Sequence, residues 1–373
     1  MKKVAFVTLS MTKGGAERVI ANMCNDYLSK KYEVTIISFM RVPAEYVLND
    51  GIKLIFLDKE EKQKEQGMLT RFMRRKKALK RELRKLSPDF IISFLPEPNF
   101  ISLSLRNKLD IPTIISVRND PVKEYAGTLR QLLMKHYYKR ADGYVFQTEE
   151  ARDYFSFSKY IMSHSEVISN PLDKSFIAQN IKNSKNKESA NAKKIAMNVG
   201  RLEKQKDQVT LIEAFAQCHE KCPDWELRIY GEGSLHDYLM LLIKEKGLLE
   251  SVFLCGNVDD IRGKMEEADL FILSSLYEGM PNALMEAMAM ELPVISTDCP
   301  CGGPSMLTEG GKRGILVPVS DVSALADKML WVMEHPNEAE ELGKCAGKIK
   351  EELSPEMIYG KWDDIIKSLF EQN

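Results

Sequence analysis

The amino-acid sequence predicts an α/β protein made of two similar domains, each built around a parallel sheet. In both halves of the chain, short apolar runs of strand length alternate with helical stretches, an alternation typical of parallel sheets. Between the halves lies a polar, charged segment, residues 180–194, with almost no large apolar side chains. A chain of 373 residues with 44% hydrophobic composition is also long enough for two cores.

The expected strands of the first half lie near residues 4–9, 34–39, 54–56, 90–94, 113–116 and 143–146. Those of the second half lie near residues 195–199, 227–230, 252–255, 270–273, 294–296 and 315–317. The last stretch of the chain spaces its apolar residues like an amphipathic helix, which we expect to pack back on the first domain. The predicted domains are residues 1–172 with a C-terminal helix at about 355–373, and residues 173–354.

Composition narrows the classes of protein that are possible. No apolar run approaches the length of a membrane-spanning helix, and the first residues lead into a strand without a signal-peptide cleavage site. We therefore expect a cytoplasmic protein. Seven cysteines without paired C-x2-C spacing and five scattered histidines indicate reduced thiols and no structural zinc.

The net charge of −1 hides an asymmetry. Residues 1–172 contain 30 Lys and Arg against 20 Asp and Glu, whereas residues 173–373 contain 23 against 34. The basic half suits an anionic surface, and charge alone leaves both membrane and nucleic acid open.

Ligands of open parallel sheets bind beyond the carboxyl ends of the strands, so the loops that follow strands are the candidate sites. The first such loop, residues 12–17, contains Gly14 and Gly15, which would let the backbone approach a ligand and adopt unusual φ angles. The loop does not match the G-x-G-x-x-G fingerprint, and a tight structural turn explains the glycine pair equally well.

The second loop, residues 198–207, follows the first strand of the second half. Asp207 can cap the next helix. Arg201 and Lys206 can converge on one anion, the guanidinium as a fork and the ammonium as a point charge. A solvated basic loop is the alternative.

The third loop contains the sequence YEGMPNALMEAMA. Pro281 favours a helix start at that residue, which places Glu278 in the loop and Glu286 in the second helical turn. The N–H groups of a helix start attract phosphate, whereas carboxylates are better matched to neutral sugar hydroxyls. Two surface glutamates on a solvated helix are the alternative.

Taken together, GGAER after the first strand, VGRLEKQKD and YEGMPNALMEAMAMELPVISTD resemble glycosyltransferase family 4. The resemblance covers nearly the whole chain, including SNPL at 169–172 and GILVPVSD at 314–321. It implies a retaining enzyme with the GT-B fold, in which two Rossmann-like domains with parallel sheets face a central cleft. It also implies a nucleotide-diphosphate sugar donor and a role in bacterial surface-polysaccharide or lipid-linked oligosaccharide synthesis.

Carried onto this sequence, the resemblance implies that Arg201 and Lys206 bind the donor diphosphate. Glu278 would bind hydroxyls of the transferred sugar, and Glu286 would hold the ribose. Backbone contacts to the donor would come from Gly279, Met280, Pro281 and Asn282, with Gly14 and Gly15 facing it across the cleft. No metal ion or other cofactor is expected, because side-chain cations and helix amides supply the positive charge at the diphosphate.

Related sequences often carry a histidine after the strand at 113–116, and here Arg118 and Asn119 occupy that place. Arg118 is a candidate catalytic residue that binds a phosphate of donor or acceptor, with simple pairing to Asp120 as the alternative. Retention is assigned in this family to attack from the leaving-group face, the departing phosphate helping to take the acceptor proton. Glu278 is the nearest candidate for electrostatic support of the oxocarbenium-like centre.

Residues 69–86 carry nine Lys and Arg against one acidic residue. A broken apolar stripe accompanies the charges, formed by Leu69, Phe72, Met73, Leu79, Leu83 and Leu86. The pattern suits a helix that lies on an anionic membrane, and equally a surface helix that packs its stripe on the first domain. Nucleic acid is disfavoured, since no aromatic platform or base-reading motif is present.

The predicted function is transfer of a hexose or N-acetylhexosamine from a nucleotide-diphosphate sugar, with UDP favoured. The predicted acceptor is a glycan, in particular an undecaprenyl-diphosphate-linked oligosaccharide at the inner face of the cell membrane. A nucleotide-sugar epimerase or hydrolase of the same fold, and an inactive nucleotide-binding partner in a membrane assembly, are the alternatives.

Overall fold

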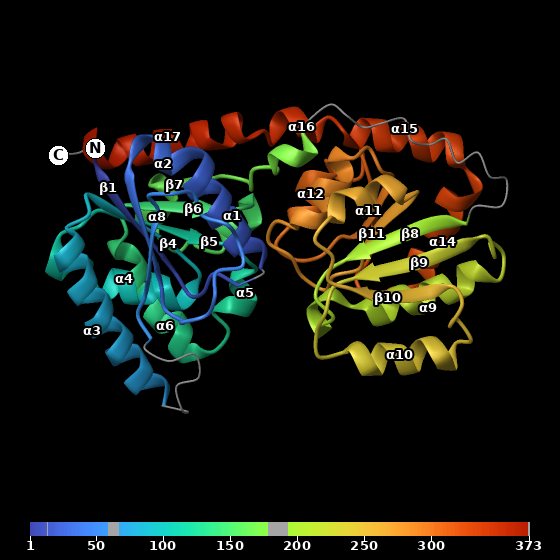
Figure 1. Ribbon diagram of the computed structural model, residues 1–373, viewed down its shortest axis with the longest axis horizontal. Coiled ribbons are helices and arrows are strands. Elements are labelled where there is room, and N and C mark those ends of the chain that lie inside the picture. The colour runs from blue at the N-terminus through green and yellow to red at the C-terminus, as the bar shows by residue number, and fades with distance from the viewer. Residues whose placement is uncertain (13, 59–66, 178–192, 372–373) are drawn as a thin grey trace. The chain divides into compact units, whose positions relative to one another are not determined.

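The computed structural model describes residues 1–12, 14–58, 67–177 and 193–371 (Figure 1). The chain forms two compact units, Met1–Pro171 with Ile358–Asn373 and Leu172–Met357. These limits lie close to the predicted boundary after residue 172 and to the predicted start of the last helix. Most of the polar segment at 180–194 lies outside the described residues.

The first unit contains a seven-stranded parallel sheet in the order β3-β2-β1-β4-β5-β6-β7. Its strands are β1 Lys3–Thr8, β2 Glu33–Ser38, β3 Lys53–Phe56, β4 Phe90–Phe94, β5 Thr113–Val117, β6 Gly143–Phe146 and β7 Ser165–Val167. Six of them confirm predicted strands. The seventh, β7, was missed because its three residues form no apolar run and none is buried.

The helices of the first unit cover both faces of this sheet (Figure 1). They are α1 Gly15–Met23, α2 Ser29–Lys31, α3 Met68–Leu86, α4 Pro96–Leu109, α5 Pro121–Glu124, α6 Thr128–Tyr137, α7 Glu149–Asp153 and α8 Lys159–Ser163, with a π-helical turn at Cys24–Leu28 and a 3-10 turn, η2, at Tyr138–Arg140. The π turn directly follows α1 and leads into α2, so the helical stretch after Gly14 is not regular along its length.

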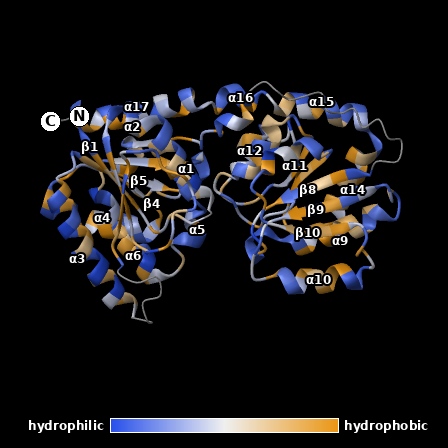
Figure 2. Ribbon diagram, in the orientation of Figure 1, coloured by the Kyte–Doolittle hydropathy of each residue, from blue (hydrophilic) through white to orange (hydrophobic). Residues whose placement is uncertain are grey.

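Helix α3 packs part of its apolar stripe on the first unit. Leu79 and Leu83 are fully buried against Ile37 and Ile91 of the sheet and Leu105 of α4. The strands of this sheet are coloured largely as hydrophobic in Figure 2. The surface-helix interpretation is therefore correct for the C-terminal half of this helix. None of the helices in the described ranges is long and apolar enough to cross a membrane.

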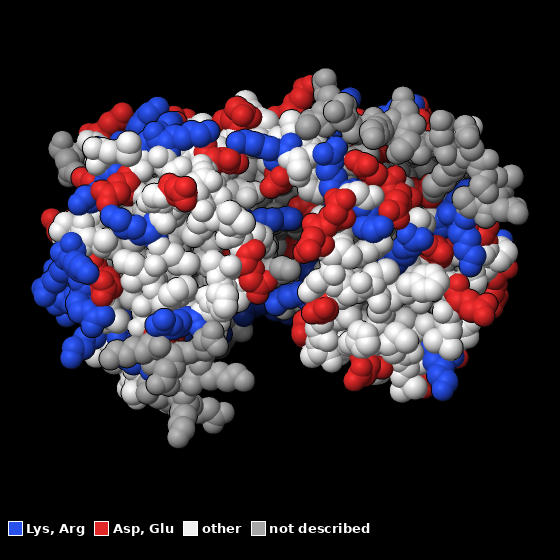
Figure 3. All heavy atoms as spheres, viewed as in Figure 1, with Lys and Arg blue, Asp and Glu red and all other residues white. Residues whose placement is uncertain are grey.

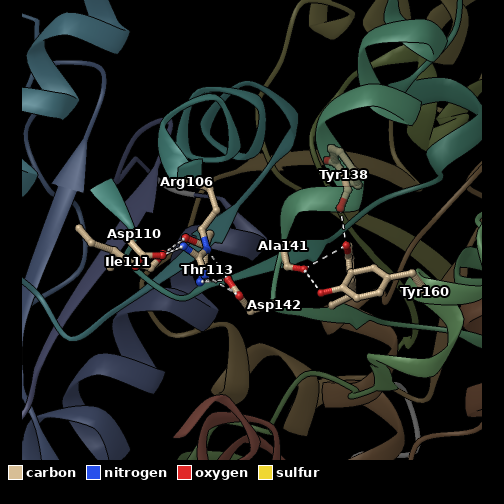
Figure 4. Close-up of polar contacts among 9 residues, drawn as sticks. Arg106, Asp110, Ile111, Thr113, Tyr138, Ala141, Asp142 and Tyr160 are labelled. Carbon is tan, nitrogen blue, oxygen red and sulfur yellow. Dashed lines mark hydrogen bonds and ion pairs between the residues drawn. The ribbon is translucent and has the colours of Figure 1, made fainter. Parts of the chain in front are cut away.

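A polar network joins α4 to the starts of β5 and β6 (Figure 4). The Arg106 guanidinium donates Nε and Nη2 hydrogen bonds to both carboxylate oxygens of Asp142, at 2.7 and 2.9 Å, and an Nη1 bond to Asp110 at 2.7 Å. Asp142 also accepts from the backbone N–H of Thr113 at 2.8 Å. One arginine thus fixes a helix end and two strand ends at once.

The last helix, α17 Pro355–Glu371, packs on the first unit. Trp362 is 2% exposed and stacks on Phe94, with ring centroids 6.1 Å apart. Asp363 accepts hydrogen bonds from the Tyr27 hydroxyl and the Lys31 ammonium. The apolar spacing of the last residues therefore marks the face that completes this core.

The second unit contains a six-stranded parallel sheet in the order β10-β9-β8-β11-β12-β13. Its strands are β8 Lys194–Val199, β9 Trp225–Tyr230, β10 Val252–Gly256, β11 Leu270–Leu273, β12 Val294–Thr297 and β13 Ile315–Val317. All six were predicted. In both sheets the order reverses next to the first strand, which is where open α/β sheets bind ligands.

The helices of the second unit lie on both faces of its sheet (Figure 1). They are α9 Gln208–His219, α10 His236–Glu245, α11 Ile261–Glu267, α12 Asn282–Ala289, α13 Gly303–Leu307, α14 Val322–Glu334, α15 Pro336–Ala346 and α16 Ile349–Glu352, with 3-10 turns η3 Lys174–Phe176 and η4 Lys204–Lys206.

Candidate active site

Three neighbouring strands of the second sheet, β8, β11 and β12, end at the same edge because they are parallel. The loops after β8 and β11 are bonded to each other. Ser274 donates an Oγ hydrogen bond to the Lys206 carbonyl at 2.8 Å, and the Leu276 N–H donates to the Gln205 carbonyl at 2.8 Å. These bonds hold the two loops as one surface.

Lys206 and Glu278 form an ion pair at this surface. The Lys206 ammonium donates to Oε1 of Glu278, and the Ser275 hydroxyl donates to the same oxygen at 2.7 Å. Glu278 is only 6% exposed. The prediction from sequence gave Lys206 and Glu278 separate roles. In the structure the two side chains are paired across two loops.

Asp207 is the N-cap of α9, and Lys206 directly precedes it in the chain. It takes a left-handed conformation with φ 46°, and its carboxylate accepts from the Thr210 hydroxyl at 2.8 Å and caps α9. The predicted cap is confirmed. A cap contributes about 1 kcal/mol and holds the preceding turn in place.

Arg201 lies on the same loop with an exposed side chain. Its guanidinium donates to Oε1 of Gln205 at 3.5 Å. Lys206 is bound to Glu278, so the described contacts do not bring the two cations onto one group. The prediction that they bind one diphosphate stays a prediction.

The turn before α12 is built on a close backbone contact. A Cβ atom on Gly303 would lie 1.8 Å from the Gly279 carbonyl oxygen, so only glycine fits there. The helix itself runs from Asn282 with Pro281 as its N-cap. The predicted start at Pro281 was wrong by one residue, because Pro281 has extended rather than helical backbone angles.

Glu286 lies in the second turn of α12, as predicted, and is 4% exposed. Glutamate is rarely buried to this extent without a partner. Together with Glu278, it excludes the alternative of two solvated surface glutamates. Met280, in the loop, and Asn282, the first residue of α12, were predicted to contact the donor and lie between the two carboxylates in sequence.

Cys299 is the thiol beside this cluster. Burial, with the charge of the neighbouring Glu278 carboxylate, raises its pKa to about 12. The thiol is therefore protonated at neutral pH and unsuited to act as a nucleophile.

In the first unit, Gly14 and Gly15 stand at the start of α1. The expected unusual φ is wrong for Gly14, whose φ is −141°, an ordinary extended value. A Cβ atom at this position would lie 2.2 Å from the Glu17 carboxylate, a contact that a different Glu17 rotamer would relieve. The Tyr46 hydroxyl also donates to the Gly14 carbonyl at 3.0 Å. Lys13, in the same loop, lies outside the described residues.

Arg118 is buried at the end of β5, 8% exposed. It donates to the Asn170 side-chain carbonyl and to the Ser116 hydroxyl, and its guanidinium lies 4.5 Å from the Phe94 ring centroid. Asp120 instead caps α5 through the Val122 N–H. The alternative that Arg118 pairs with Asp120 was therefore wrong.

The surroundings of Arg118 are polar but neutral. Its Nε is buried and lacks a hydrogen-bond partner among the described residues, as does Oε1 of Gln147. Gln147 donates to Asn170 at 2.8 Å, so both side chains share one acceptor. Burial lowers the pKa of Arg118 to about 9, which shows how poorly the described surroundings compensate its charge.

Sequence reasoning missed the supporting residues of both clusters. Ser275 and Gln205 position the groups in the second unit, and Asn170 and Gln147 surround Arg118. Asn170 was visible within the SNPL motif, but nothing in the sequence connected it to Arg118. No group of three or more His, Cys, Asp or Glu side chains in the described ranges could hold a metal ion.

Solved structures share this architecture along the whole chain. Anabaena HepE in complex with UDP matches with a TM-score of 0.80 at 18% identity, covering 98% of this chain and 100% of that one. Sucrose-phosphate synthase from Thermosynechococcus elongatus matches with a TM-score of 0.86 at 18% identity, with 100% of both chains covered. The two Rossmann-like units have the GT-B fold.

The family follows from the sequence models. Residues 13–176 match the model described as Glycosyltransferase Family 4, and residues 179–348 match Glycosyl transferases group 1. The chain therefore belongs to the two-domain glycosyltransferases whose first half matches the family 4 model and whose second half matches the group 1 model.

Two similar relatives come from Campylobacter jejuni. The N-acetylgalactosamine-N,N'-diacetylbacillosaminyl-diphospho-undecaprenol 4-alpha-N-acetylgalactosaminyltransferase is 28% identical over 94% of this chain and 97% of its own length. An α-1,4-N-acetyl-D-galactosaminyltransferase that acts on a diphospho-undecaprenol-linked glycan is 25% identical over 98% of both chains. An uncharacterized glycosyltransferase of Methanocaldococcus jannaschii is 32% identical over 66% of this chain, but the match spans only 62% of that relative.

Proposed function

We propose that this glycosyltransferase moves an N-acetylhexosamine or hexose, with retention, from a UDP-sugar to an oligosaccharide carried on undecaprenyl diphosphate. The pairing of Lys206 with Glu278 at the edge of the second sheet carries the donor half of this proposal. The names of the two Campylobacter relatives support the acceptor half, because both matches span nearly the whole chain.

The ion pair suits a site that must bind phosphate and sugar side by side. An ammonium has three donors, so Lys206 can keep Glu278 and still donate to a phosphate oxygen. Lys206 would then stand between the carboxylate and the diphosphate and reduce their repulsion. Both bonds to Glu278 end on Oε1, which leaves Oε2 for a sugar hydroxyl.

The remaining donor contacts keep their predicted assignments. Arg201 binds the diphosphate from the exposed side of the loop, and Glu286 binds the ribose. The backbone from Gly279 to Asn282 contacts phosphate and sugar. In this proposal no metal ion is needed, and activity survives treatment with a chelator.

The reaction requires no side-chain nucleophile. The bond from the anomeric carbon to the β-phosphate oxygen breaks, and the acceptor hydroxyl oxygen bonds to the same face of that carbon. Its proton passes to the departing phosphate. The Glu278 carboxylate stabilises positive charge on the sugar during this exchange.

Arg118 is the proposed anion-binding group of the first unit. A buried guanidinium with neutral partners is costly, and a phosphate would supply the missing charge. The acceptor carries such a group in its diphosphate.

Helix α3 is the proposed point of electrostatic attachment to an anionic membrane. Its Lys and Arg side chains gather on one side of the first unit (Figure 3). Each exposed basic residue near an anionic bilayer contributes about 1 kcal/mol. The expected attachment is loose and sensitive to salt.

A donor panel tests the proposal most directly. The purified protein is incubated with UDP- and GDP-sugars, with and without an undecaprenyl-diphosphate-linked acceptor and with a chelator present, and the products are analysed. Acceptor-dependent release of UDP with an α-linked product supports the proposal. Conversion of the donor to a free or epimerised sugar without acceptor would establish the epimerase or hydrolase, and binding without turnover would indicate the inactive partner.

A further inference from the structure

Helix α6 carries leucines that do not take part in the core of its unit. Of its ten residues, Met134 is the buried one. Leu129, Leu132 and Leu133 are 69%, 60% and 40% exposed. Their spacing of three and four residues places them on one helical face. Helices of globular proteins usually turn such a face inward, and here it faces solvent.

The surroundings of this face are basic. Residues 121–140 contain Lys123, Arg130, Lys135, Lys139 and Arg140, and their only carboxylate, that of Glu124, is half-buried. Apolar side chains ringed by cations are the composition of helices that lie in the interface of a bilayer. A face that binds another protein would not require this excess of positive charge.

The basic surface continues from α6 onto α3. Burial lowers the pKa of Lys76 on α3, and so do the nearby charges of Lys108 on α4 and Arg140 in η2, directly after α6. The three cations therefore lie within electrostatic reach of one another. A groove of about 780 Å³ along α3 includes Lys76 and Lys108 in its lining.

Exposed apolar residues also mark the first turns of α3. Met68, Leu69 and Met73 are 68%, 75% and 55% exposed, in contrast to the buried Leu79 and Leu83 further along the helix. The first part of the stripe is thus free of the core and lies beside basic residues. The surface formed by α3 and α6 therefore has both features of a membrane-interface site, exposed apolar side chains and positive charge.

We propose that α6 is a membrane-insertion element, whose three leucines enter the acyl region of an anionic phospholipid bilayer while the flanking cations bind headgroup phosphates. This extends the attachment through α3 given under the proposed function, and rests on it in assuming that the enzyme works at a bilayer. Charge on α3 then attracts the protein, and the leucines of α6 retain it.

Co-sedimentation with vesicles of phosphatidylglycerol and phosphatidylcholine separates these two contributions. The triple variant Leu129→Ser, Leu132→Ser, Leu133→Ser should lose binding at low and high salt alike, by about tenfold per leucine. The variant Arg71→Ser, Lys77→Ser, Lys80→Ser should lose mainly the salt-sensitive part. A matched control, Leu241→Ser with Leu249→Ser, removes two leucines of similar exposure from the second unit, 54% and 52%, and should bind like wild type.

Insertion has its own readout. In a Leu132→Trp variant, lipids brominated in the acyl chain should quench fluorescence beyond the level seen with the native tryptophans. UDP affinity and the thermal midpoint, measured on the same preparations, should be unchanged, because α6 is outside the donor site and its leucines are outside the core.

Several results would overturn the inference. Wild-type sedimentation of the leucine variant, or no added quenching in Leu132→Trp, would remove α6 from the membrane while leaving attachment through α3 intact. Absence of vesicle binding by wild type would remove both, and the donor panel in detergent would still test glycosyl transfer. A lipid-free dimer that dissociates in the leucine variant would assign the face to a second copy of the chain.

Discussion

Lys206 and Glu278, 72 residues apart in sequence, share a hydrogen bond that joins the loop after β8 to the loop after β11. Ser275 donates to the same carboxylate oxygen. A cation and an anion are thereby held side by side at one sheet edge. The pair offers neighbouring groups suited to a phosphate and to sugar hydroxyls, as the proposed donor site requires.

Breaking this pair should cost both stability and donor affinity. In Lys206→Met the Glu278 carboxylate stays buried without its partner, and in Glu278→Gln the lysine loses its counter-charge. We expect each single change to destabilise the protein by about 2 to 4 kcal/mol, and the double variant by less than their sum. Urea unfolding gives the stabilities, and calorimetry with UDP gives the affinities. If the losses of stability in the two single variants added up to the loss in the double variant, the two groups would act independently.

Glu286 should contribute to nucleotide binding rather than to the chemical step. Glu286→Gln keeps the shape and removes the charge, so UDP affinity should fall roughly ten- to hundredfold, the equivalent of a charge-assisted hydrogen bond. Glu245→Gln, at an exposed position of α10 in the same unit, serves as the control. Equal affinity in the two variants would contradict the ribose assignment.

Arg118 should affect the acceptor half of the reaction. Arg118→Lys keeps the charge but loses the planar fork, and we expect turnover with a diphosphate-linked acceptor to fall about ten- to hundredfold. Affinity for UDP should hold. Arg41→Lys, at an exposed position of the same unit, is the matched control. A parallel loss of UDP affinity would assign Arg118 to the donor instead.

Glu124 should make the stability of the protein fall as pH rises. Burial and the nearby Asp120 raise its pKa from 4.5 to about 8. Because the folded state holds this proton more tightly, the stabilising effect is complete below about pH 4.5 and is lost by about pH 8. Glu124→Gln should therefore raise the thermal midpoint relative to wild type at pH 8 and have little effect at pH 5. A difference between the two proteins that does not change with pH would rule out this titration.

The Arg106 network should be a stability determinant of the first unit. Arg106→Met leaves Asp142 and its bond to the Thr113 N–H without the bidentate partner, and should cost about 1 to 3 kcal/mol in urea unfolding. Donor binding in the second unit should not change. Arg41→Met, which breaks no bidentate pair, should unfold at the wild-type midpoint.

The sequence predicted twelve of the thirteen strands in the described part of the chain, because parallel strands covered on both faces form continuous apolar runs. The strand β7, partly exposed and only three residues long, gave no such signal. Side-chain partners were beyond this reasoning. The contact of Arg118 with Asn170 spans 52 residues and depends on how β5 and the segment after β7 meet. The contact that a side chain at Gly14 would make likewise depends on the Glu17 rotamer, which no local pattern specifies.

Helix α17 also has a consequence for how the protein is made. The first unit is discontinuous, since Trp362 and its neighbours complete a core whose other residues precede Pro171. A ribosome must therefore synthesise the entire second unit before the first can close. The second unit can fold during translation, whereas the first unit stays incompletely packed until the end of the chain emerges.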